Sequence, residues 1–154
     1  MPAFPLAVWA VLTGILPPPS PCTNLCTCRN PGGPREELST AAAVLEGVAG
    51  RQRPYGIRSR SGASTVTRVL VERVWKGAVA DTLYVFSGSP GGTDCGYEFI
   101  DGVRYLLYLY REPEGRWAIT ICSLSAPSSS ARDQMSVLGP PQRLVQQGSH
   151  VVSP

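Results

Sequence analysis

Residues 65–75 read TVTRVLVERVW, and this stretch decides the fold. It is rich in β-branched side chains, which favour an extended strand. Because successive side chains of a strand face opposite sides, Val69, Val71 and Trp75 are predicted to share one face. Arg73 is a charged exception on that face. The opposite face carries charged residues, namely Arg68, Glu72 and Lys76. The pattern therefore predicts a long strand, apolar on one side, that ends at Gly77.

Four more strands are predicted, at residues 44–49, 81–87, 103–110 and 116–122. The stretch 81–87 (DTLYVFS) is predicted to be apolar on both faces. Residues 112–115 (EPEG) predict a turn, and residues 89–96 form a glycine-rich loop. Short helices are predicted at residues 34–42, where Pro34 suits a first turn, and near residues 131–138. Five short strands separated by turns indicate a mainly β protein, a small closed barrel rather than a sandwich, with short flanking helices.

The N-terminal segment is typical of an export signal. Residues 3–16 (AFPLAVWAVLTGIL) are about 14 apolar residues, fewer than the roughly 20 that span a bilayer. We therefore predict a signal peptide and proline-rich leader at residues 1–25, and no stable membrane span. Residues 26–127 are predicted to form the folded domain, and residues 128–154 a short helix and a flexible tail. The predicted location is secreted, periplasmic or extracellular.

The chain contains five cysteines, at positions 22, 26, 28, 95 and 122. Since five is odd, at least one stays outside any intrachain pairing. Cys22 lies in the proline-rich stretch, where it could be removed with the signal, stay free or carry a lipid that anchors the protein to the cell surface. Export favours disulfides over a metal site for the other four, and four cysteines allow three pairings. A core of about 100 residues gains much from such cross-links.

Charge and histidine content restrict the chemistry. The net charge of +3 is mild, and the single histidine, His150, lies in the predicted tail. We therefore expect no enzyme, no cofactor and no metal of the protein's own, because no Ser/His or Cys/His pair is plausible. The loop at residues 50–64 holds four arginines but only one aromatic residue, Tyr55. Since barrels that bind single strands interleave aromatic and basic residues, the loop is predicted to be solvated, with no nucleic-acid partner.

Four short motifs carry a resemblance to a known family. In order, they are Cys26-Thr27-Cys28 before a proline-rich segment, Arg73-Val74-Trp75-Lys76-Gly77, Cys95-Gly96-Tyr97, and Cys122-Ser123 followed by Ala126-Pro127. Their order and separations resemble the netrin-like module, specifically the N-terminal inhibitory domain of tissue inhibitors of metalloproteinases. The resemblance covers residues 26–127. It implies a five-stranded OB-fold barrel, stapled by the disulfides Cys26–Cys95 and Cys28–Cys122.

The chain departs from vertebrate members of that family. They have a third bridge in this domain and a second, cysteine-rich domain, and neither has cysteines here. The sequence looks like a minimal, single-domain relative of the bacterial type.

The resemblance also implies a function, inhibition of a zinc metalloprotease. In these inhibitors the first cysteine is the mature N-terminus, and its α-amino nitrogen and carbonyl oxygen chelate the protease's zinc. The implied inhibitory ridge is Cys26, Thr27 and Cys28, with Thr27 entering the specificity pocket and Thr93 and Asp94 flanking it. The family tends to have an uncharged residue where Asp94 stands. The alternative is a non-inhibitory secreted or cell-envelope module of the same fold that binds another extracellular protein.

Overall fold

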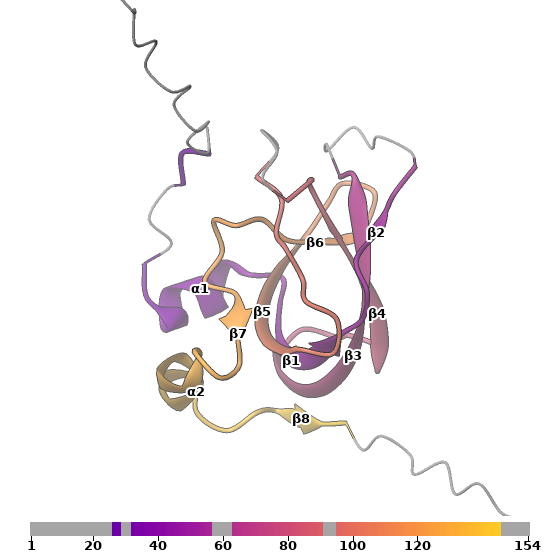
Figure 1. Cartoon of the computed structure of the whole chain (residues 1–154). Helices are drawn as coiled ribbons and strands as arrows, with labels where there is room; N and C mark the ends of the chain where they lie inside the picture. The colour runs from indigo at the N-terminus through magenta and orange to yellow at the C-terminus, as the bar shows by residue number, and fades with distance from the viewer. Residues whose placement is uncertain (1–25, 29–31, 57–62, 91–94, 146–154) are drawn as a thin grey trace, which may run out of the picture.

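The computed structural model describes residues 26–28, 32–56, 63–90 and 95–145 (Figure 1). Two short helices flank a sheet to which every strand of the described residues belongs. In chain order the elements are α1 (Pro34–Thr40), β1 (Ala43–Ala49), β2 (Arg53–Pro54), β3 (Thr65–Lys76), β4 (Thr82–Ser87), β5 (Arg104–Arg111), β6 (Trp117–Ala118), β7 (Ala126–Pro127), α2 (Arg132–Leu138) and β8 (Arg143–Leu144).

The sheet closes into a barrel of five strands. Its order is β1-β3-β4-β6-β5, and β5 pairs back onto β1. The β4–β6 pair is parallel and the other barrel pairs are antiparallel. Counted along the chain, the barrel strands are arranged 1-2-3-5-4 and close on the first, which is the OB-fold topology. The mainly β class, the closed barrel and both helices are therefore confirmed.

The apolar residues form two clusters on opposite sides of the barrel wall. The first fills the barrel, and its largest fully buried members are Leu45, Leu107, Leu109 and Ile119. The second lies between the wall and the helices, and contains Ala41, Val44, Trp75, Leu106, Tyr108 and Ala131. Figure 1 shows α1 and α2 together on that flank. The helices therefore cover an outer apolar face that the barrel could not bury alone.

The prediction that Trp75 shares a face with Val69 and Val71 is wrong. Val69 and Val71 lie in the barrel core, whereas Trp75 lies in the outer cluster. The β1–β3 register is irregular at two points, and it leaves Glu72 and Trp75 without a partner in β1. Each such extra residue is a β-bulge and reverses the alternation of faces. The bulge at Glu72 also explains Arg73, which is turned outward and whose side chain is 51% exposed.

The strand predicted at residues 81–87 carries apolar side chains on both faces, as predicted, but only one of these faces is fully buried. Leu83 and Val85 are buried, but Tyr84 between them is 57% exposed. The strand predicted at residues 116–122 is shortened to β6, Trp117–Ala118. Beyond it the chain leaves the β5 ladder, and the Ile121 backbone N–H donates to the Cys95 carbonyl at 3.1 Å.

The chain after α2 returns to the barrel, a feature that the sequence pattern did not predict. β8 pairs with the end of β3, and the Val145 backbone N–H donates to the Glu72 carbonyl at 2.8 Å. The indole N–H of Trp75 donates to the Gly139 carbonyl at 2.7 Å and fixes the end of α2. Residues 1–25 and 146–154, which include the predicted leader and most of the predicted tail, lie outside the described residues. No helix in the described ranges is long and apolar enough to cross a membrane.

Candidate functional site

The segment Cys26-Thr27-Cys28 is joined to the barrel on both sides of Thr27. Cys26 is bonded to Cys95, with their Cα atoms 5.6 Å apart, and Cys28 is bonded to Cys122, with their Cα atoms 5.1 Å apart. Both distances are ordinary for disulfides. Of the three pairings that the sequence allows, the structure contains the one that the family resemblance implies. Cys95 and Cys122, which lie 69 and 94 positions further along the chain than their partners, thus hold one short segment.

Thr27 is exposed between the two bridges. Cys28 is also exposed, whereas Cys26 is half-buried. Because both neighbours of Thr27 are covalently attached to the barrel, its backbone has little freedom to move. The segment therefore presents a side chain to solvent from a rigid support, as a recognition element requires.

The Cys95 anchor has a constrained backbone. The φ angle of Cys95 is 55°, in the left-handed region that residues other than glycine rarely adopt. The next residue, Gly96, packs against backbone: a Cβ atom there would lie 2.3 Å from the Gly88 carbonyl oxygen. A side chain larger than hydrogen does not fit at position 96. These two residues set the direction from which the Cys26–Cys95 bridge leaves the barrel.

Two polar side chains fix the backbone that follows Cys95. The buried Ser87 hydroxyl accepts from the Tyr97 N–H at 2.7 Å and donates to the Ile119 carbonyl at 3.1 Å. The Gln52 amide donates to the Tyr97 carbonyl at 2.9 Å and accepts from the Phe99 N–H at 3.2 Å. Ser87 and Gln52 therefore connect the Cys95 anchor to β4 and to the loop after β1. Sequence reasoning missed both, because neither lies in a motif.

The Cys122 anchor lies beside a small hollow. Its volume is about 180 Å³, and its lining includes Glu37, Tyr108 and Cys122. Burial raises the pKa of Tyr108 to about 12, and the nearby Glu37 carboxylate adds to this shift. Burial also raises the pKa of Glu37, an effect that a hydrogen bond from the Leu124 backbone partly offsets. The hollow therefore favours the neutral form of its acidic groups.

The remaining predicted site residues are not placed. Thr93 and Asp94, the predicted flanking contacts, lie outside the described residues, as do Cys22 and His150. The structure thus brings Cys26, Thr27 and Cys28 together with their two anchors, Cys95 and Cys122. Within the described part of the chain, no three His, Cys, Asp or Glu side chains are grouped so that they could hold a metal ion.

Comparison with protein-family models and with curated protein sequences found no match to this chain.

Proposed function

We propose that this protein is a secreted module, similar to the tissue inhibitors of metalloproteinases, that inhibits a zinc metalloprotease through the ridge Cys26-Thr27-Cys28. One observation carries the proposal: an exposed Thr27 is held by disulfides on both sides on a closed OB-fold barrel. A segment that is ordered before binding loses little conformational entropy when it binds. The two disulfides also support export, because such bonds persist in oxidising compartments.

The chemistry uses the open coordination position of a catalytic zinc, which normally holds water. The α-amino nitrogen and the carbonyl oxygen of Cys26 replace that water. The amine must be neutral to coordinate, and an α-amino group titrates near 8, so a substantial fraction is neutral at physiological pH. Thr27 then enters the pocket beside the zinc. Thr93 and Asp94 contact the rim of the cleft, where the charge of Asp94 disfavours proteases with acidic rims.

The decisive test is the mature N-terminus of the exported protein. The proposal expects intact mass and N-terminal sequencing to show a chain that begins at Cys26. A mature chain that begins upstream would contradict chelation, because a nitrogen in a peptide bond cannot coordinate zinc as an amine does.

A second test assays a panel of zinc metalloproteases with the mature protein before and after N-terminal acetylation. Acetylation is expected to abolish inhibition, and Thr27→Arg is expected to change which proteases are inhibited. Acetylation leaves both disulfides in place, so it is a matched control for the fold. Inhibition that persists after acetylation would show that another surface is responsible.

A second candidate function follows from Leu25, which directly precedes Cys26. Signal peptidases favour small side chains before the cut, and leucine is large. If cleavage occurs elsewhere, the two disulfides of the ridge serve only to stabilise the barrel. The protein is then a non-inhibitory module that binds another extracellular protein. The N-terminal sequence distinguishes the two candidates.

A further inference from the structure

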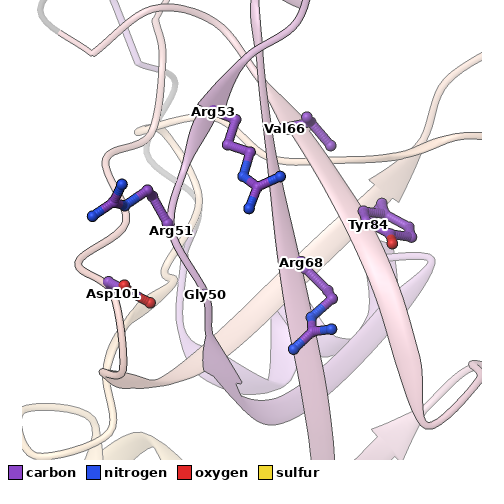
Figure 2. Close-up of a pocket in the computed structure, with 7 residues that line it drawn as sticks. All are labelled: Gly50, Arg51, Arg53, Val66, Arg68, Tyr84 and Asp101. Carbon is purple, nitrogen blue, oxygen red and sulfur yellow. The ribbon is translucent and has the colours of Figure 1, made fainter.

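A pocket of about 500 Å³ lies on the outer surface of the barrel, away from the residues of the ridge and its anchors. We call it the basic pocket. It is lined by the loop after β1, by β2, β3 and β4, and by Asp101, and Figure 2 shows its seven residues: Gly50, Arg51, Arg53, Val66, Arg68, Tyr84 and Asp101. Among the described residues that line it, three arginines therefore share one depression with a single carboxylate.

Strand pairing brings these side chains together. Arg53 in β2 pairs with Val66 in β3, and Arg68, two residues further along β3, pairs with Tyr84 in β4. Since residues two apart on a strand face the same side, Val66 and Arg68 both face outward. Figure 2 shows the Arg53 side chain directed toward Arg68, whereas Arg51 projects toward Asp101. Arg53, Arg68 and Tyr84 thus form one continuous surface.

The arginines of the basic pocket have no counter-ion within the described residues. Four other arginines form ion pairs: Arg73 with Glu46, Arg104 with Glu72, Arg116 with Glu112 and Arg143 with Asp81. No described carboxylate lies within 4.0 Å of the guanidinium nitrogens of Arg51, Arg53 or Arg68; the same holds for Arg35, Arg111 and Arg132, but only the first three line one pocket together. Like charges held together repel one another, and a bound anion relieves that repulsion while accepting charge-assisted hydrogen bonds.

The form of the pocket selects among anionic ligands. Tyr84 is 57% exposed, and because it pairs with Arg68 across β3 and β4, it offers a flat ring on the same surface as the arginines. A sugar ring that carries anionic groups can pack on this ring and pair with the arginines. Single-stranded nucleic acid needs a series of aromatic side chains for successive bases, and Tyr84 is the only aromatic residue among the described residues that line the pocket.

We propose that the basic pocket binds an acidic polysaccharide. Arg53 and Arg68 contact its sulfate, phosphate or carboxylate groups, and Tyr84 packs against a sugar ring. Asp101 weakens the interaction by its negative charge. The two disulfides agree with this ligand, because they persist in the oxidising extracellular space where such polymers occur. The proposal does not depend on zinc chelation, because it uses none of the residues of the ridge.

The experiment measures binding of a sulfated, heparin-derived octasaccharide by calorimetry at low and at physiological salt. A neutral octasaccharide of glucose and a single-stranded oligodeoxythymidine of similar charge serve as the other probes. The sulfated probe is expected to bind best, with an affinity that falls as salt rises. Asp101→Asn should strengthen binding, and Tyr84→Ser should weaken it.

The key variant is Arg53→Ala/Arg68→Ala, which should weaken binding about tenfold or more, because hydrogen bonds to charged groups are among the stronger ones. Its matched control is Arg35→Ala/Arg132→Ala, which removes the same net charge from exposed positions on α1 and α2. The control should bind the octasaccharide within about twofold of the unmodified protein, since it leaves the pocket intact.

Three results would overturn the proposal: no binding of the sulfated octasaccharide, an equal loss in the two double variants, or tighter binding of oligodeoxythymidine. The last two would indicate non-specific charge attraction and a nucleic-acid site, respectively. Binding is also measured on N-terminally acetylated protein. Because N-terminal acetylation leaves every residue of the basic pocket unchanged, retained binding alongside lost inhibition separates the two functions, and either can fail without the other.

Discussion

Replacing Gly96 with alanine tests how the Cys95 anchor is built. The new Cβ atom would lie 2.3 Å from the Gly88 carbonyl oxygen, and 2.4 Å from the carbonyl carbons of both Gly88 and Ser89. Ordinary contact begins at 3.4 Å, so the atoms must separate by about 1 Å. Overpacking typically costs 1–3 kcal/mol, and here the neighbours are backbone atoms that cannot rotate away. We therefore expect Gly96→Ala to lower the free energy of unfolding by about 3 kcal/mol or more.

The assay is urea unfolding with both disulfides intact, followed by tryptophan fluorescence and extrapolated to water. The matched control is Gly56→Ala, because a Cβ atom there has no neighbour within 4 Å and the backbone needs no positive φ. An alanine that fits without strain stabilises by about 0.4–1 kcal/mol, since it restricts the unfolded chain. The same chemical change should therefore have opposite signs at the two positions. If Gly96→Ala were within about 0.5 kcal/mol of Gly56→Ala, the close packing of residue 96 would be refuted.

Other predictions concern groups in the barrel wall and under the helices. Trp75→Phe removes the hydrogen bond to the Gly139 carbonyl and should cost about 1–2 kcal/mol in the same urea assay. Arg73→Ala leaves the carboxylate of Glu46, whose side chain is only 4% exposed, without its partner at 3.2 Å. The expected loss is about 1–2 kcal/mol, and adding Glu46→Gln should recover most of it; no recovery would show that Arg73 acts by packing alone. Because burial raises the pKa of Glu37 above its ordinary 4.5, this carboxyl contributes stability below that pH, and the contribution is lost as the pH rises through the folded-state pKa. Glu37→Gln should therefore gain stability relative to the unmodified protein as the pH rises above 4.5, and a constant difference in thermal midpoint from pH 4 to 7 would contradict this.

The barrel was predictable from the sequence because its strands are local patterns. The β-branched side chains of residues 65–75 predict a strand, and β3 includes all of these residues. The bulges in the same strand were not predictable. They depend on how β3 must bend against β1 when the sheet closes, which is a property of the closed barrel rather than of one strand. For that reason the sequence pattern placed Trp75 on the wrong face of the strand.

The ridge could be predicted from the sequence, whereas the basic pocket could not. The ridge is visible in the sequence because its cysteines form a motif, although the residues alone leave three pairings and the family resemblance selects one. The basic pocket could not be predicted, because it depends on the pairing of β3 with β2 and β4. β2 has two residues and no recognisable pattern, and the prediction that residues 81–87 are apolar on both faces concealed the exposed Tyr84.

The double attachment of residues 26–28 has a mechanical consequence. A segment held by one cross-link can still swivel about that bond, so only its position is fixed. Cross-links on both sides of Thr27 fix its orientation as well. The Cys95 and Cys122 anchors are also joined by the hydrogen bond from the Ile121 N–H to the Cys95 carbonyl. A displacement of either anchor is therefore transmitted to Thr27 as a tilt, and a force on Thr27 is transmitted back to both anchors at once.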